Sequence, residues 1–430
     1  MTAKLQTYLK YRSSNTSWIE DIPDNWLSRR GKFFFRSRKR INADSNCDNI
    51  LSLTMKGVVH REELGEGGLL PASYETFQIF YPNDLAFKLI DLENYKTSRV
   101  GLVLEKGIMS SAYVRLIIID ESLINAKFAY YFYYNLYLQG IYNFLGMGVR
   151  STLTPWNLLE ISILIPPLET QKRIADFLDE KTKITDELIE KKEKLIEFLR
   201  EKRAALITRA VTKGLDPKAK MKPSGVDWLG DIPVGWEIKK LKHVATVNRK
   251  SLSEDSTNPN FEFDYVDIGN VNSEGKILEL QNYSFANAPS RARRLAENGD
   301  VIISTVRTYL RAMTRISNAE NLVFSTGFAI FHPTKILDSW LYWSMQSEVF
   351  LAHVMANSTG VNYPGINEQK LSSISLLVSD EKEQRQIADF LDAETAKIDK
   401  ATALIGAQIE KLKEYRSSLI YHAVTGKIKV

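Results

Sequence analysis

The sequence predicts an α+β protein written twice: two globular domains of mixed helix and strand, joined by two long helices that form a coiled coil with pseudo-twofold symmetry. The first observation is a repeat, in which QKRIADFLD at residues 171–179 returns as QRQIADFLD at residues 384–392. The second is that apolar residues after each copy recur at spacings of three and four, which is typical of a long helix with one apolar stripe. The third is that short β-rich runs precede each helix.

The repeat divides the chain into a constant frame and two unlike inserts. WIEDIPDNW at residues 18–26 is matched 210 positions later by WLGDIPVGW at residues 228–236. This period far exceeds the ~20–50 residues of a stacking repeat, so each copy is a domain plus a helix. Residues 27–158 and 237–371 share only faint echoes, such as Asn83-Asp84 against Gly299-Asp300. A constant frame with different inserts indicates that the inserts carry variable recognition.

The helices have one-sided apolar patterns. In the second copy the successive d positions are Leu391, Ile398, Ile405, Leu412 and Leu419, with Ile387, Ala401 and Tyr415 among the a positions. The first copy has a looser stripe, in which Thr185 and Lys192 interrupt the d row: Ile174, Leu178, Leu188, Leu195, Leu199 and Leu206. Each helix of about 43 residues would be roughly 65 Å long. Such a narrow stripe favours packing of the two copies on each other, and the alternative is that each helix packs on its own domain.

The inserts show mixed patterns. We expect strands at Val100–Leu104, Tyr113–Ile119, Ile161–Ile165, Phe263–Ile268, Val301–Ser304, Phe328–Phe331 and Ile374–Val378, and helices at Asn125–Gln139 and Leu337–His353. The predicted organisation is an N-terminal segment (1–17), a first recognition domain (18–168), a first helix (169–213), a linker (214–227), a second recognition domain (228–380), a second helix (381–425) and a tail (426–430). Gly214 and Gly426 predict helix stops at the same place in both copies. Because the tail matches what begins the central linker, we expect the N- and C-termini to lie close in space.

Composition excludes several classes of protein. The chain has 430 residues, 44% hydrophobic and 25% charged, with a net charge of +5, which is the balance of an ordinary globular protein. A single cysteine, Cys47, excludes a disulfide framework and a cysteine-based zinc site. No run reaches the ~18 apolar residues of a membrane helix. The N-terminus lacks the apolar core of a signal peptide. We therefore expect a cytoplasmic protein.

Motifs for catalysis are also missing from the sequence. Gly426-Lys427 lacks the upstream glycine and the following hydroxyl of a phosphate-binding loop, and no glycine-rich dinucleotide fingerprint follows a strand. Pro166-Pro167 lacks the preceding Asn or Asp of an amino-methyltransferase loop, and no GxSxG elbow is present. Together these observations favour a binding protein.

Basic residues cluster in the inserts and suggest nucleic acid. The run RRGKFFFRSRKR at residues 29–40 surrounds three phenylalanines with seven cations, and the second insert carries six arginines between Arg291 and Arg315. Lysine and arginine neutralise phosphates, and arginine can also read guanine. The candidate DNA-binding residues are Lys56, Lys88, Tyr95, Arg99 and Arg150 in the first insert, and Arg307, Tyr309, Arg311, Asn362 and Tyr363 in the second. Arg150 and Asn362 follow similar glycine-containing segments, GMGVRST and STGVNYP.

Three sequence features together resemble the specificity subunit of type I restriction-modification systems. They are the repeated W-x-x-D-I-P-x-x-W, the run PPLETQKRIADFLD at residues 166–179, and the ending ALITRAVTKG at residues 205–214. The resemblance covers essentially the whole chain. The second copy departs from it at Val378-Ser379-Asp380, where the first has Ile165-Pro166-Pro167.

The resemblance implies a non-catalytic, DNA-reading subunit in a prokaryotic host-defence complex. Each insert would be a target recognition domain for one half of a bipartite, asymmetric double-stranded DNA sequence, and the two long helices would form an antiparallel coiled coil that sets the spacing. Two modification (methyltransferase) subunits would bind the helices and frame, and restriction subunits with a translocating motor would join them. No cofactor or metal is expected on this chain, with S-adenosylmethionine, ATP and Mg on the partners. The alternatives are a coiled-coil scaffold whose inserts bind a partner other than DNA, and an enzyme with an unrecognised site.

Overall fold

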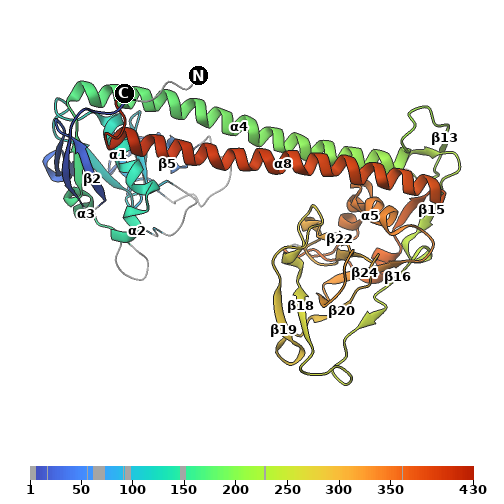
Figure 1. Ribbon diagram of the computed structural model, residues 1–430. Coiled ribbons are helices and arrows are strands. Elements are labelled where there is room, and N and C mark those ends of the chain that lie inside the picture. The colour runs from blue at the N-terminus through green and yellow to red at the C-terminus, as the bar shows by residue number, and fades with distance from the viewer. Residues whose placement is uncertain are drawn as a thin grey trace. The chain divides into compact units, whose positions relative to one another are not determined.

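The chain folds into two units whose boundary falls inside both long helices (Figure 1). The computed structural model describes residues 6–16, 18–55, 57–61, 73–90, 92, 98–145, 152–226, 229–360 and 362–430. Unit 1 comprises Met1–Lys192 and Ala407–Val430, and unit 2 comprises Glu193–Gly406. Each unit therefore contains one insert, the beginning of one long helix and the end of the other. Among the described helices, none combines the length and the apolar character that crossing a membrane requires.

Unit 1 holds the first insert. Its strands are β1 (Tyr11–Thr16), β2 (Ile19–Pro23), β3 (Leu27–Arg30), β4 (Phe35–Ser37), β5 (Leu51–Thr54), β6 (Gly57–His60), β7 (Gln78–Phe80), β8 (Leu85–Phe87), β9 (Val100–Leu102), β10 (Gly107–Met109), β11 (Val114–Ile118) and β12 (Ser162–Ile165). Its helices are α1 (Ala126–Leu138), α2 (Ile141–Leu145), α3 (Pro155–Glu160) and the start of α4 (Leu168–Lys213).

Unit 2 holds the second insert. Its strands are β13 (Met221–Pro223), β14 (Asp231–Pro233), β15 (Glu237–Lys240), β16 (Ala245–Val247), β17 (Lys250–Ser251), β18 (Glu262–Val266), β19 (Gln281–Ser284), β20 (Ala292–Leu295), β21 (Val301–Ser304), β22 (Met313–Arg315), β23 (Leu322–Ser325), β24 (Phe328–Pro333) and β25 (Ser375–Val378). Its helices are α5 (Asp338–Gln346), α6 (Glu348–Ala356), α7 (Glu368–Ser372) and the start of α8 (Glu381–Val424).

The two inserts share one sheet topology although their sequences diverge. Unit 1 has a four-stranded sheet in the order β4-β11-β8-β9, and unit 2 repeats it as β16-β24-β21-β22. In both units the first and last strands of the insert pair antiparallel, β3 with β12 and β15 with β25. The echo at Asn83-Asp84 and Gly299-Asp300 marks the same turn, because Asn83 and Gly299 have positive φ (72° and 88°). Beyond this sheet the units differ, since unit 2 adds the five-stranded sheet β17-β20-β23-β18-β19.

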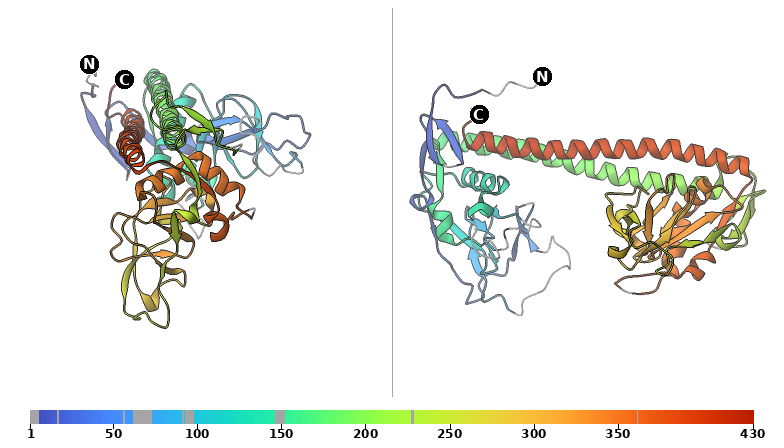
Figure 2. Two further views of the ribbon diagram at one scale, coloured as in Figure 1. Left: turned by 90° about the vertical axis from the view of Figure 1, so that its right-hand side faces the viewer. Right: turned by 60° about the horizontal axis from the view of Figure 1, so that its bottom comes forward.

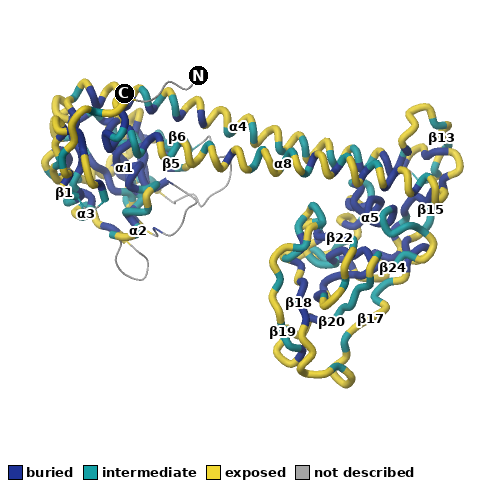
Figure 3. Tube along the Cα trace, viewed as in Figure 1, coloured by how far each residue is buried: buried dark blue, intermediate teal, exposed yellow. Residues whose placement is uncertain are grey.

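Each core is closed by helix ends from both repeats (Figure 3). In unit 1 the buried residues of the core include Ile174 and Leu178 from α4 together with Ile420 and Val424 from α8. The unit 2 core includes the residues 213 positions away from these in the repeat: Ile387, Leu391, Ile207 and Val211. The repeated W-x-x-D-I-P-x-x-W motif also contributes, because its last residue, Trp26 in unit 1 and Trp236 in unit 2, is buried in each core. The apolar helix residues are therefore part of both globular domains.

Helices α4 and α8 also lie side by side and antiparallel, as the different views show (Figures 1 and 2). One row of the seam is the predicted one, with Leu391, Ile398 and Leu419 buried and Ile405 and Leu412 half-buried. The second predicted row is wrong at three positions. Leu188, Leu195 and Tyr415 are 41%, 45% and 53% exposed.

The true second row of the seam lies on the other flank of the first row. It consists of Thr182, Ile189, Ile196, Arg203 and Ala210 in α4 and of Thr395, Thr402, Ile409, Arg416 and Ala423 in α8, all buried or half-buried. Threonine and arginine hid this row from a search for apolar residues. The break predicted at Thr185 is also accommodated, because its hydroxyl is buried and donates to the Lys181 carbonyl oxygen at 2.8 Å.

Ion pairs related by the repeat join the two helices. In unit 2 Arg203 Nε lies 3.0 Å from Asp399 Oδ1, and in unit 1 Arg416 Nε lies 2.8 Å from Asp186 Oδ1. Both guanidinium groups lie over an aromatic ring, that of Trp343 at 5.8 Å and that of Tyr134 at 5.5 Å. The half-buried Lys192 donates from Nζ to Gln408 Oε1 at 2.6 Å within unit 1. Polar seam residues thus fix the helix register in each unit.

Other predictions from the sequence fare differently. The expected proximity of the termini is confirmed within unit 1, where Lys429 N donates to the Gln6 carbonyl oxygen at 2.7 Å. The single helix expected over residues 337–353 is wrong. It breaks at Ser347 (φ −68°, ψ 144°), whose hydroxyl caps the new helix α6 by accepting from Phe350 N at 3.3 Å. Both long helices end just before the predicted glycines, Gly214 and Gly426, which have φ of 74° and 71°.

A buried glutamine fastens the start of each long helix to its insert. Gln171 Oε1 accepts from Asn125 N at 2.8 Å, and Nε2 donates to the Pro166 carbonyl oxygen at 2.8 Å. Gln384 repeats the arrangement, accepting from Leu337 N at 3.0 Å and donating to the Ser379 carbonyl oxygen at 2.7 Å. The difference between Pro166 and Ser379 therefore leaves this arrangement unchanged, since each residue contributes its backbone carbonyl oxygen to the glutamine.

Replacing this amide tests its contribution to stability. We expect Gln171→Leu to lower the free energy of unfolding by about 1–3 kcal/mol, because buried backbone groups lose their partners. At roughly 2–4 °C per kcal/mol for a unit of this size, calorimetry should show a melting temperature lower by several degrees. Lys172→Ala, which removes an exposed partner of Glu169, is the control and should change stability by less than about 0.5 kcal/mol. Equal melting temperatures for Gln171→Leu and wild type would contradict this role.

Candidate nucleic-acid interface

Two loops of unit 2 meet where strand β21 of its four-stranded sheet ends and strand β22 begins. The first, residues 305–312, connects β21 to β22 and contains a short 3-10 turn at Thr308–Leu310. The second, residues 357–367, connects α6 to α7. These loops carry all five candidate residues of the second insert. The structure therefore brings together predictions that lie about fifty positions apart in the sequence.

Hydrogen bonds hold the two loops together. Val306 and Gly365 form an isolated bridge, and Ile366 N donates to the Thr305 carbonyl oxygen at 2.8 Å. The Thr308 and Ser358 hydroxyls lie 3.0 Å apart. Gly365 allows a close approach of the two backbones, because a Cβ there would stand 3.1 Å from the Thr305 carbonyl oxygen. The loop pair is thus a built surface whose side chains project from a fixed backbone.

The candidate side chains on this surface differ in their availability. Tyr309 and Tyr363 are 49% and 67% exposed, and Arg307 and Asn362 are also exposed. The Arg307 guanidinium lies over the Tyr363 ring, 4.9 Å from its centroid. Arg311 is engaged within the unit, because both of its terminal nitrogens pair with the Glu348 carboxylate, Nη2 with Oε2 at 3.0 Å. We infer that Arg311 orders the loop and is less available to a ligand.

The equivalent place in unit 1 is described only in part. Leu153 N donates to the Leu89 carbonyl oxygen at 3.0 Å, which matches the bond from Ile366 to Thr305 in unit 2. Lys88 is half-buried at the start of this loop. The predicted residues Lys56, Tyr95 and Arg150 lie outside the described residues.

The structure corrects the prediction for Arg99, whose side chain is fully buried. Lys88 and Arg99 are joined by a backbone hydrogen bond across the base of their loop, as Ser304 and Ala312 are in unit 2. The bonds from Lys88 N to the Arg99 carbonyl oxygen (3.0 Å) and from Ser304 N to the Ala312 carbonyl oxygen (2.8 Å) are equivalent. Ala312 is buried as well. The guanidinium turns inward, where Nη1 donates to the Ile90 carbonyl oxygen at 3.2 Å.

Carboxylates neutralise several of the other predicted basic residues. Arg30 and Lys32 both pair with Glu160, at 2.6 and 2.9 Å, and Arg293 pairs with Glu254 at 3.0 Å. Arg36 and Arg38 of the first cluster are exposed. Arg29, Lys39 and Arg40 are exposed as well, and Lys39 donates from Nζ to the Ser111 carbonyl oxygen at 2.9 Å.

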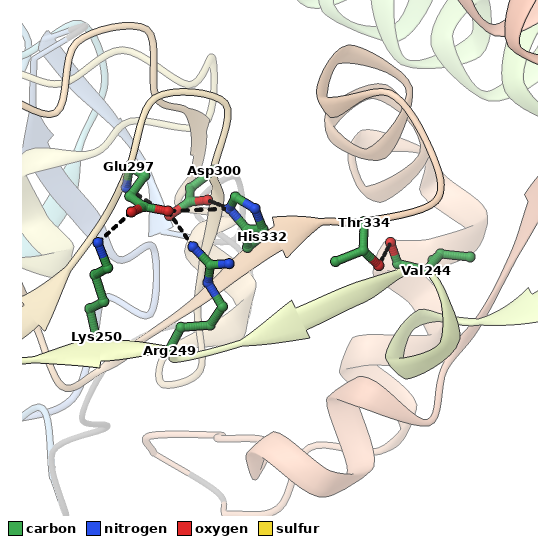
Figure 4. Close-up of polar contacts among 7 residues, drawn as sticks. All are labelled: Val244, Arg249, Lys250, Glu297, Asp300, His332 and Thr334. Atoms are coloured by element: carbon green, nitrogen blue, oxygen red, sulfur yellow. Dashed lines mark hydrogen bonds and ion pairs between the residues drawn. The ribbon is translucent and has the colours of Figure 1, made fainter.

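One group of side chains in unit 2 has the atoms for a metal site (Figure 4). Glu297, Asp300 and His332 place their ligand atoms within 4.8 Å of one another, and His332 Nδ1 lies 2.7 Å from Asp300 Oδ1. Arg249 and Lys250 already pair with Glu297, and the bond from Lys250 holds the pKa of that carboxyl below its usual value. Asp300 also accepts from Glu297 N at 2.8 Å, as Asp84 of unit 1 accepts from Tyr81 N. The group therefore serves as a structural polar network.

Sequence reasoning missed the residues that build the loop surface. Glu348, which holds Arg311, also donates from its backbone N to Thr208 Oγ1 in α4 at 2.9 Å. Thr308 and Gly365 were not identified, although Gly365 directly follows the segment STGVNYP that the sequence analysis singled out. Identical polar residues in the two repeats gave a clear signal that the apolar patterns did not use: Gln171 and Gln384, Asp179 and Asp392, and Arg203 and Arg416.

Comparisons with known proteins agree with this architecture. Residues 72–197 and 233–414, more than half of the chain, match the family model described as "Type I restriction modification DNA specificity domain". The chain is 26% identical over 338 residues to the type I restriction enzyme MjaVIII specificity subunit of Methanocaldococcus jannaschii, covering 76% of this chain and 75% of that protein. It is 24% identical over 312 residues to the putative type I restriction enzyme MjaX specificity subunit of the same organism, covering 69% and 68%.

A solved structure has the same fold over nearly the whole chain. It is described as "Structural basis underlying complex assembly and conformational transition of the type I R-M system", has a TM-score of 0.68 and 15% identity, and covers 95% of this chain and 99% of its own. The duplicated frame, the unlike inserts and the family match lead to one conclusion. The chain belongs to the specificity subunits of type I restriction-modification systems.

Proposed function

We propose that each unit reads one half of a bipartite, asymmetric target in double-stranded DNA. The observation that carries this proposal is that one sheet topology occurs in both units while the loops on it differ. The loop between β8 and β9 spans residues 88–99, whereas its counterpart between β21 and β22 spans residues 305–312. Because base edges are read by side chains that reach into a groove, different loops on one scaffold give different half-sites.

The exposed side chains of unit 2 fit such a reading surface. Arg307 offers donors suited to guanine, and Asn362 has the amide geometry that pairs with adenine. Tyr309 and Tyr363 add apolar surface with polar tips. The wider basic residues, Arg36 and Arg38 in unit 1 among them, would contact phosphates and make binding depend on salt.

In this proposal the helix pair is the spacer and the docking frame. The ion pairs Arg203–Asp399 and Arg416–Asp186 fix its register in each unit, and the spacer role is supported by the family match. Apolar side chains also remain exposed on the helices: Ile184, Leu188 and Tyr415 in unit 1, and Leu195, Phe198 and Leu404 in unit 2. We propose these as contacts for two modification subunits, with restriction subunits joining the assembly.

The chain itself supplies recognition without a catalytic step in this proposal. S-adenosylmethionine would bind the modification subunits, and ATP and Mg would act on the partners that restrict DNA. The family match favours this assignment over a scaffold for partners other than DNA.

The exposed apolar residues give a test of docking. We expect Phe198→Glu and Leu188→Glu each to weaken co-purification with modification subunits at least tenfold, since burying such a side chain is worth about 1.5–3 kcal/mol. The fold should persist, because Leu188 and Phe198 are 41% and 60% exposed. Glu197→Gln, at an exposed polar position of the same helix, is the matched control. Wild-type recovery of modification subunits with both apolar variants would contradict this surface.

The proposed function is tested by mapping methylated bases in cells. Genomes from cells with the modification subunit should show a methylated adenine motif in two separated halves when this chain is present. The motif should vanish when the gene for this chain is deleted and return when it is restored. A methylation pattern unchanged by the deletion would overturn the proposal.

A further inference from the structure

Arg307 is the uncommitted arginine of the loop surface. The loop of residues 305–312 contains two arginines, and Arg311 is neutralised by Glu348. Arg307 is exposed and forms no ion pair with any residue that the structure describes. The same loop thus uses one guanidinium for its own structure and leaves the other arginine exposed.

The backbone at Arg307 is held in an unusual conformation. Its φ and ψ are 50° and 49°, the left-handed region, which costs a residue with a side chain about 1–2 kcal/mol. The bridge from Val306 to Gly365 precedes this residue, and the contact between Thr308 and Ser358 follows it. Arg311 shares this left-handed conformation (φ 55°, ψ 27°), and the ion pair of Arg311 with Glu348 is what distinguishes the two arginines.

The side chain is held as well as the backbone. The Arg307 guanidinium lies over the exposed ring of Tyr363, 4.9 Å from the centroid. A cation over a ring face is attracted to the π-system, which restrains the position of the guanidinium while the side chain stays exposed. An arginine held in this way loses less rotamer freedom when it pairs with two acceptors on one base.

We propose that Arg307 reads a guanine of the half-site bound by unit 2 through the O6 and N7 acceptors in the major groove, with Tyr363 as its positioning residue. This inference rests on the proposed function and adds the base that one side chain selects. Arg307 then determines sequence preference, whereas an arginine on a phosphate would strengthen binding to all sequences alike.

The test uses the chain assembled with its modification subunits and the DNA motif mapped from methylated genomes. Binding is measured to the wild-type target and to targets with each base pair of the half-sites replaced. Arg307→Lys keeps the charge but loses the planar fork. We expect it to reduce the preference for one G·C pair by roughly 5- to 150-fold while other positions and the salt dependence stay unchanged.

Modified bases identify the atoms involved. Replacing that guanine by 7-deazaguanine removes N7 and should weaken binding by the wild type far more than binding by Arg307→Lys. Inosine, which keeps O6 and N7 and lacks the minor-groove amino group, should be tolerated. Tyr363→Phe should keep the preference because it keeps the ring, and Tyr363→Leu should lose part of it. Arg385→Lys, at an exposed position on α8, is the matched control and should behave as wild type.

Three results would overturn the inference while leaving the proposed function standing. They are a unit 2 half-site without a G·C pair, a preference that Arg307→Lys leaves intact, and a uniform loss of affinity across all base substitutions. A wild-type complex with no sequence preference at all would instead overturn the proposed function.

Discussion

The rest of the structure depends on the burial of helix ends from both repeats in each globular core. In unit 1, Leu178 at the beginning of α4 and Ile420 near the end of α8 are fully buried, and Leu391 and Ile207 take these places in unit 2. Each such side chain stabilises its core by about 1.5–3 kcal/mol. The ends of the long helices are therefore part of the core of each insert. The loops of each insert can therefore vary between the units only while the core beneath them keeps its contacts with both long helices.

The frame and the recognition surface follow different physical rules. Frame residues recur at equivalent positions: Gln171 and Gln384 close the junctions, and Arg203 and Arg416 cross the helix seam. Loops on the shared sheet face no such requirement, so they differ in length and in sequence. Glu348 connects the frame with the loops. Its carboxylate pairs with Arg311 in the loop of residues 305–312, and its backbone N donates to Thr208 in α4.

Much of this architecture could be predicted from the sequence because repetition shows which residues the fold requires. The repeat predicted the helices, their ends and the proximity of the termini, which the bond from Lys429 N to the Gln6 carbonyl oxygen confirms. Apolar patterning misplaced one row of the seam at Leu188, Leu195 and Tyr415, because the true row is occupied by threonine and arginine as well as isoleucine. At the candidate surface, the sequence named Arg307 and Tyr363 as separate candidates, and their convergence appears only in the structure, where the bridge from Val306 to Gly365 joins their loops. Burial of Arg99 depends on tertiary contacts that local sequence does not record.

An exchange of inserts tests the central claim most directly. Residues 237–378 would be replaced by the corresponding insert of another specificity subunit with a known target, keeping both long helices, and methylated bases would be mapped in cells. The account predicts that one half of the motif changes to that of the donor, while the other half and the spacing stay as in the parent. A motif that changes in both halves, or one that keeps both parental halves, would contradict the account.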